Sequence, residues 1–289
     1  MEIRFATARD LEDVRYIWKI CFSDSETYMN LFFSTMYVPG NTLLAVEENK
    51  VIGALQFFYR EICFENKTIS SAYIGGVSVL PDFQGKGIAS KLMLQCETVL
   101  SAQGVSLLFL VPAVFPIYRR LGYTPLSCLT DISGKSEDLK PFITENGSLF
   151  SAPFPFSVYE HFQKSCSLSL KREETQVKKA IELSENALIK VTENADGYLI
   201  YKEENGLLLG LECIYETESA FREILGFIYA KRNDVSDFRL RMPTSCNARW
   251  ILFDKAFTET RYPHILAKAI DGHVPSFSDK HYINMIGWF

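Results

Sequence analysis

The sequence predicts an α/β protein in which a mixed, mostly antiparallel sheet flanked by helices is built twice. A length of 289 residues suits about two domains of ~150 residues each. Residues 1–132 carry strand and helix signals in the order β-α-α-β-β-β-α-β-α-β. The order hairpin, helix, strand over 197–242 repeats the order over 51–111, which indicates a second, degenerate copy. We therefore expect a first domain over 1–132, a linker over 133–152 and a second domain over 153–289.

Apolar periodicity and turn residues define the elements of the first half. Apolar side chains at spacings of three and four residues predict helices over 10–22, 26–36 and 87–103. Runs of β-branched and aromatic residues predict strands over 3–6, 42–47, 51–62, 69–80, 105–111 and 123–132, of which the second to fourth form a meander with short turns. Residues 117–121 are predicted to form a short helical turn.

The second half has fewer clear signals. Asn205-Gly206 predicts a hairpin turn between strands over 197–202 and 206–215. An amphipathic helix is predicted over 217–231. Weaker patterns indicate a helix over 154–164 and strands over 235–242 and 250–253.

Composition excludes several classes of protein. Hydrophobic residues make up 47% and charged residues 22%, and 30 Lys+Arg against 35 Asp+Glu give a net charge of −5. This composition does not suit a disordered chain or a nucleic-acid binder. The longest apolar stretch, 107–118, is interrupted by prolines and is shorter than a membrane span. The N-terminus has no apolar core of the signal-peptide type. We expect a cytoplasmic protein without a nucleic-acid or membrane partner.

The cysteines and histidines show no metal-binding pattern. The seven cysteines include no Cys-x-x-Cys pair, and the four histidines have no metal-ligand spacing. We expect reduced, mostly packed thiols and no metal site.

The stretch from Val77 to Ser90 carries the chemistry. A strand ends at Pro81, two glycines follow at Gly85 and Gly87, and a helix opens. The first amides of a helix lack intrahelical partners and lie at the positive end of its dipole, so such a turn can bind a phosphate group. Lys86 either assists or is simply solvated. The alternative is a tight turn whose glycines serve packing alone.

This turn resembles the Gln/Arg-x-x-Gly-x-Gly/Ala signature of the Gcn5-related N-acetyltransferases (GNAT). The resemblance implies acetyl-CoA as cosubstrate, with the pyrophosphate on the amides of residues 85–90. It also implies that the backbone of the preceding strand binds the pantetheine arm. The implied coenzyme-binding residues are Val77, Ser78, Val79, Gln84, Gly85, Lys86, Gly87, Ile88, Ala89 and Ser90.

A second segment, Ile117 to Tyr123, is similar to the family's Phe/Tyr-Tyr-x-x-x-Gly-Phe/Tyr segment. The resemblance implies that Tyr118 is the general acid that protonates the leaving thiolate. The pKa values of a phenol and a thiol, ~10 and ~8.5, suit that transfer. The alternative is a tyrosine that packs a helix against the sheet.

Within this family the sequence resembles the Eis-type tandem acetyltransferases, without a complete sterol-carrier-like domain. In that group the terminal carboxylate acts as general base, which here implies Phe289. A packed strand end is the alternative for this residue. The segment before the 217–231 helix has no Gly-x-Gly turn, so we expect no second coenzyme site.

The resemblance implies an N-acetyltransferase that acts on a primary amine by direct attack, with no covalent intermediate. Asp24 and Glu26, at the first helix-to-helix turn, are candidates for binding the acceptor's ammonium group, and helix capping is the alternative. The acceptor is a small molecule or a peptide amine. An acyl-CoA-binding sensor without transferase activity is the alternative function, and the sequence leaves the oligomeric state open.

Overall fold

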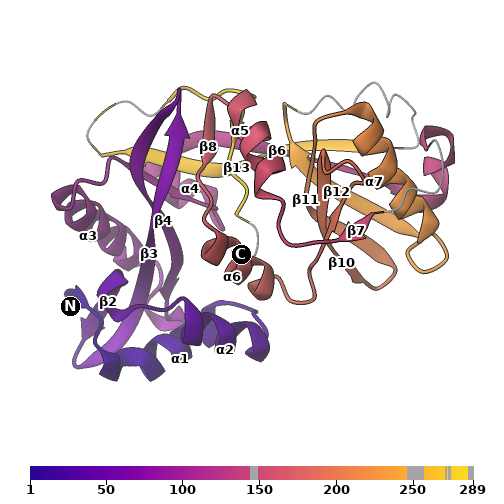
Figure 1. Ribbon diagram of the computed structural model, residues 1–289. Coiled ribbons are helices and arrows are strands. Elements are labelled where there is room, and N and C mark those ends of the chain that lie inside the picture. The colour runs from indigo at the N-terminus through magenta and orange to yellow at the C-terminus, as the bar shows by residue number, and fades with distance from the viewer. Residues whose placement is uncertain (144–148, 246–256, 271, 273–274, 286–289) are drawn as a thin grey trace. The chain divides into compact units, whose positions relative to one another are not determined.

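The computed structural model describes residues 1–143, 149–245, 257–270, 272 and 275–285 (Figure 1). The chain divides into two compact units. The first consists of residues 1–63, 67–126 and 265–276, and the second of residues 64–66, 127–264 and 277–289. None of the described helices is both long enough and apolar enough to cross a membrane.

The first unit is a mixed sheet in the order β1-β2-β3-β4-β5-β13. Its strands are β1 (Glu2–Phe5), β2 (Thr42–Glu47), β3 (Lys50–Phe64), β4 (Lys67–Val79), β5 (Leu107–Leu110) and the end of β13 (Thr258–Ala269). Its helices are α1 (Leu11–Cys21), α2 (Glu26–Thr35), α3 (Ile88–Ala102) and α4 (Phe115–Arg120). The predicted meander is confirmed as β2, β3 and β4, because turns at positive φ follow β2 and β3.

Helices cover both faces of this sheet. A Cβ at Gly53 of β3 would contact Ile88 and Leu92 of α3. Gln56 lies three residues further along β3 and therefore points to the opposite face, where it meets Trp18 of α1 around Gly76. The core between the sheet and α3 contains Leu55, Phe57, Leu92, Met93, Cys96 and Leu108, all 2% exposed or less.

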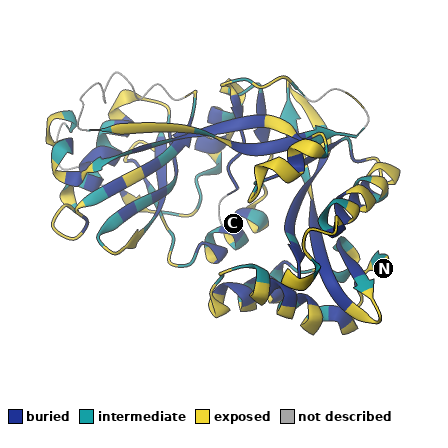
Figure 2. Ribbon diagram, turned by 180° about the vertical axis from the view of Figure 1, so that it is seen from behind, coloured by how far each residue is buried: buried dark blue, intermediate teal, exposed yellow. Residues whose placement is uncertain are grey.

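The second unit has the sheet order β6-β12-β11-β10-β9-β7. Its strands are β6 (Thr124–Lys135), β7 (Phe150–Ser151), β8 (Leu168–Leu170), β9 (Leu188–Val191), β10 (Gly197–Glu204), β11 (Leu207–Tyr215), β12 (Asp237–Pro243), the first part of β13 and β14 (His281–Tyr282). Its helices are α5 (Phe156–Ser165), α6 (Glu174–Leu183) and α7 (Glu218–Ala230). Figure 2 shows that the strands of each unit are largely buried, whereas the helices expose one side.

Two buried clusters cover the faces of the second sheet. Cys213 packs with α7 in one cluster, and its neighbour Ile214 packs with α5 and Tyr282 in the other. The predicted hairpin and amphipathic helix are confirmed as β10, β11 and α7, with Asn205 and Gly206 both at positive φ.

The domain boundaries differ from those expected. The first unit ends at Leu126 rather than at residue 132, and residues 265–276 return to it. The segment 133–152, expected to be a linker, contributes Leu139 and Leu149 to the core of the second unit. Its polar composition concealed these anchors. The strand expected over 250–253 lies outside the described residues.

Candidate active site

The site begins where β4 leaves its neighbour β5. The two strands pair in parallel over Ser71–Tyr73 and Leu107–Phe109. Residues 74–79 continue β4 beyond this ladder. Gly76, at φ 58°, breaks the regular strand inside that extension. The pairing of β4 with β5 thus ends before Val77 and Val79, where an extended, amide-rich ligand could continue it.

The turn after β4 leads directly into α3. Residues 84–87 are exposed, and Gly85 and Gly87 have φ values of 75° and 76°. No described heavy atom lies within 4 Å of the place where a Cβ on either glycine would stand. Packing therefore does not require these glycines. Their positive φ values favour glycine, and the space in front of the helix is open.

The N-terminus of α3 lacks a cap from the described side chains. Gly87 accepts the first helical bond, from Lys91 N–H at 3.1 Å, so the amides of Ile88, Ala89 and Ser90 precede the intrahelical ladder. Three amides, a helix dipole and open space form a site for an anion.

Several predicted coenzyme-binding side chains serve the turn itself. Gln84 Nε2 donates to the Val79 carbonyl oxygen at 2.9 Å, which ties the turn to the end of β4. Ser78 Oγ points inward and donates to the carbonyl oxygens of Ala54 and Gly76. Lys86 Nζ lies 4.8 Å from the centre of the Phe83 ring. These contacts leave backbone amides, rather than side chains, as the anion ligands.

Tyr118 lies in the same buried cluster as Val79, with Val77 packed against it. It comes from α4 and is 8% exposed, and its ring centre is 6.2 Å from that of Tyr123. Burial raises the pKa of Tyr118, so its phenol stays protonated at neutral pH. Burial raises the pKa of Tyr73, the last β4 residue paired with β5, and the neighbouring Tyr28 and Tyr118 add to that shift. Tyr118 therefore presents a protonated phenol in the cluster that contains Val79.

The α1–α2 turn lies against the end of β4, because Cys21 Sγ donates to the Val79 carbonyl oxygen at 3.4 Å. Ser25, rather than Asp24 or Glu26, caps α2 by accepting from Tyr28 N–H at 2.9 Å. Asp24 instead accepts from Trp18 Nε1 at 2.8 Å. Glu26 is exposed and forms an ion pair with Lys19 at 2.5 Å.

The remaining predictions fall in two groups. Phe289 lies outside the described residues. Cys21, Cys63, Cys96, Cys128 and Cys166 are free thiols. In the described part of the chain, no group of three or more histidine, cysteine or acidic residues could hold a metal ion. The sequence analysis missed the contributions of Trp18 and Gln56, although a glutamine between apolar neighbours in a strand is a detectable signal.

Comparison with known proteins agrees with this geometry. Residues 2–126 match the model of the acetyltransferase (GNAT) domain. An acetyltransferase of Pectobacterium atrosepticum is 29% identical over an alignment of 140 residues, and the match covers 45% of this chain and 92% of that protein. Residues 2–126 are therefore similar to a GNAT acetyltransferase domain.

Solved structures extend the likeness of fold to both units. A GCN5-related N-acetyltransferase from Kribbella flavida matches with a TM-score of 0.77 and 19% identity, over 93% of this chain and 71% of that one. Eis1 from Mycobacterium abscessus matches with a TM-score of 0.72 and 16% identity, over 94% and 74%. A conserved protein of unknown function from Enterococcus faecalis matches with a TM-score of 0.79 and 18% identity, over 93% of this chain and 72% of that one. The chain therefore has the fold of these proteins.

Proposed function

We propose that the chain transfers an acetyl group from acetyl-CoA to a primary amine by direct attack on the thioester. The observation that carries this proposal is the uncapped, glycine-lined start of α3 directly after a strand that has left its neighbour. A pyrophosphate would bind the α3 amides, and the pantetheine arm would bond to the free edge of β4 near Val77 and Val79.

The chemistry follows from the same elements. The amine must lose a proton before attack, because an ammonium group has no lone pair. Backbone amides of β4 would stabilise the oxyanion that develops on the thioester carbonyl. Tyr118, buried and protonated, would give its proton to the departing thiolate.

Asp24 is the better supported of the two acceptor candidates. Its turn is attached to the end of β4 through Cys21, and Trp18 fixes one of its carboxylate oxygens. A carboxylate held there would attract an ammonium group toward the thioester. Glu26 is more exposed and already pairs with Lys19.

The test combines calorimetry with turnover. Acetyl-CoA should bind the wild-type protein, and thiol release should follow when amines are screened as acceptors. Tyr118→Phe should lower kcat by ~10²–10⁴ with little change in coenzyme affinity, because only the acid is removed. Tyr123→Phe, the neighbouring buried tyrosine, is the matched control and should keep near-normal turnover.

Each outcome has a definite meaning. No binding by the folded wild-type protein would overturn the transferase proposal. Binding without turnover on any amine would favour an acyl-CoA sensor instead. Full activity in Tyr118→Phe would remove the acid role from this residue alone.

A further inference from the structure

Gln56 is a polar side chain sealed inside the first unit. It lies on β3 and is 1% exposed. Within the described chain, neither Oε1 nor Nε2 of its carboxamide has a hydrogen-bond partner. Burying an amide without partners destabilises a protein, and most buried polar side chains avoid it.

The carboxamide lies against β4 at Gly76. A Cβ placed on Gly76 would overlap Gln56 Oε1 and would come within 2.6 Å of Trp18 Cζ3. Glycine is therefore required there for two reasons, the φ of 58° and the space that Gln56 and Trp18 fill. The residue that follows is Val77, on the edge where the pantetheine arm is expected.

An apolar side chain of similar volume would fill this space without the desolvation penalty. The same face of the sheet supports such packing, because Ala54 and Phe58, two residues to either side of Gln56, are buried. A carboxamide brings one advantage over an apolar group, which is its ability to donate and accept hydrogen bonds. Among the described residues, no group makes a hydrogen bond with the Gln56 carboxamide.

We propose that Gln56 is a positioning residue whose carboxamide bonds to the β4 backbone around Gly76 when acetyl-CoA binds. The inference rests on the proposed function. The pairing of β4 with β5 that the structure describes ends at Tyr73, so a ligand added to β4 beyond that point can shift the peptide units around Gly76. The shift brings main-chain groups of residues 75–77 within hydrogen-bond distance of the Gln56 carboxamide. Part of the coenzyme's binding free energy then comes from a residue that it does not touch.

The test compares Gln56→Met with Leu55→Met, a volume-conserving change at the adjacent, fully buried position. Thermal unfolding without ligand and the Kd for acetyl-CoA are measured for both. Gln56→Met should keep or raise the unfolding midpoint, by about 2–4 °C, and should weaken acetyl-CoA binding about tenfold. Leu55→Met should lower the midpoint slightly and leave the Kd unchanged.

A purely structural glutamine would give a different pattern. An unchanged Kd in Gln56→Met would overturn the inference. A midpoint lower than that of Leu55→Met, or failure to fold while Leu55→Met folds, would also overturn it, because the carboxamide would then stabilise the free protein. Gln56→Leu repeats the comparison with a second apolar side chain. If the wild-type protein does not bind acetyl-CoA, the proposed function itself fails.

Discussion

Each unit has a helix after its hairpin, α3 in the first and α7 in the second, but the N-terminus of α3 is open whereas that of α7 is capped. Both have a hairpin, a helix and a strand parallel to the second hairpin strand, as β3-β4-α3-β5 and β10-β11-α7-β12. In the first unit, residues 80–87 separate β4 from α3, and the helix start is open. In the second unit, only residues 216–217 separate β11 from α7.

Side chains and backbone of the second unit fill the start of α7. Thr217 caps the helix by accepting from Ala220 N–H at 3.0 Å. Thr217 Oγ1 donates to Asp196 Oδ2 at 2.6 Å, and Glu216 N–H donates to the Asp196 carbonyl oxygen at 2.8 Å. An acidic side chain thus stands where an anionic ligand would have to bind. The comparison teaches that the fold is repeated whereas the anion site is not.

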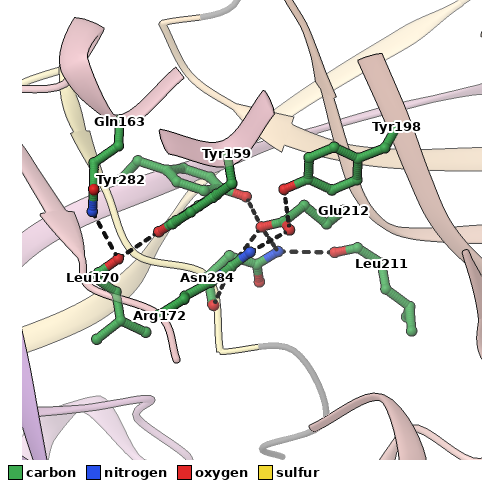
Figure 3. A network of polar contacts seen from close by, with 9 residues as sticks. All are labelled: Tyr159, Gln163, Leu170, Arg172, Tyr198, Leu211, Glu212, Tyr282 and Asn284. Carbon is green, nitrogen blue, oxygen red and sulfur yellow. Dashed lines mark hydrogen bonds and ion pairs between the residues drawn. The ribbon is translucent and has the colours of Figure 1, made fainter. Parts of the chain in front are cut away.

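The interior of the second unit contains a buried network of hydrogen bonds around an ion pair between Glu212 and Arg172. Glu212 is fully buried and accepts from Arg172 at 2.6 and 2.7 Å (Figure 3). Tyr198 donates to the same carboxylate at 2.8 Å, and Tyr282 and Asn284 complete the set. Although burial opposes it, the Glu212 carboxylate raises the pKa of Arg172 well above its usual value. These contacts fix the segment that contains Tyr282 and Asn284 to the sheet.

The largest effect should come from breaking this network. Glu212→Leu leaves Arg172 buried without its counter-ion, and we expect a loss of about 3–5 kcal/mol in the free energy of unfolding. Urea unfolding followed by circular dichroism measures it. The double variant Arg172→Met/Glu212→Leu removes both charges and should recover much of the loss. Equal losses in the single and double variants would show that the uncompensated charge of Arg172 is not the cause of the loss.

The next effect concerns the open helix start. Gly87→Glu places a carboxylate and a strained backbone at the α3 N-terminus, and we expect acetyl-CoA affinity to fall at least a hundredfold, ~2.7 kcal/mol. Gly40→Glu is the matched control, because Gly40 also has open space around it but lies away from the turn. Calorimetry measures the acetyl-CoA affinity of both variants. Unchanged binding in Gly87→Glu would remove the coenzyme from this turn.

His264 should make the free energy of unfolding of the second unit depend on pH. Burial lowers its pKa to about 3, whereas the unfolded chain takes up the proton near pH 6.5. Below that pH the unfolded state binds more protons, so stability falls as the pH falls, by about 1.4 kcal/mol for each pH unit. Urea unfolding from pH 7 to 5 should show this slope, and His264→Gln should flatten it. The same slope in the variant would mean that His264 is not the group responsible.

Local sequence patterns predicted what depends on local structure. The glycine turn, the hairpin at Asn205-Gly206 and the helices α3 and α7 were predictable because each has its own turn or periodicity signal. The return of Ile265–Ala269 to the first unit was not, because its pairing with β5 joins residues far apart in sequence. The buried tail at 281–285 was missed for the same reason. Glu212, a single charge in an apolar strand, was a usable signal of a buried partner.

The smallest predicted change removes the cap that closes α7. Thr217→Ala deletes the oxygen that accepts from Ala220 N–H and the hydroxyl that donates to Asp196. We expect a loss of about 1 kcal/mol in the free energy of unfolding, the usual cost of an N-cap. The number of acetyl-CoA sites in calorimetry should not change, because the Asp196 carboxylate and the short connection at 216–217 stay in place. A second site of comparable affinity in this variant would contradict the comparison, since it would mean that Thr217 alone keeps an otherwise competent second domain closed.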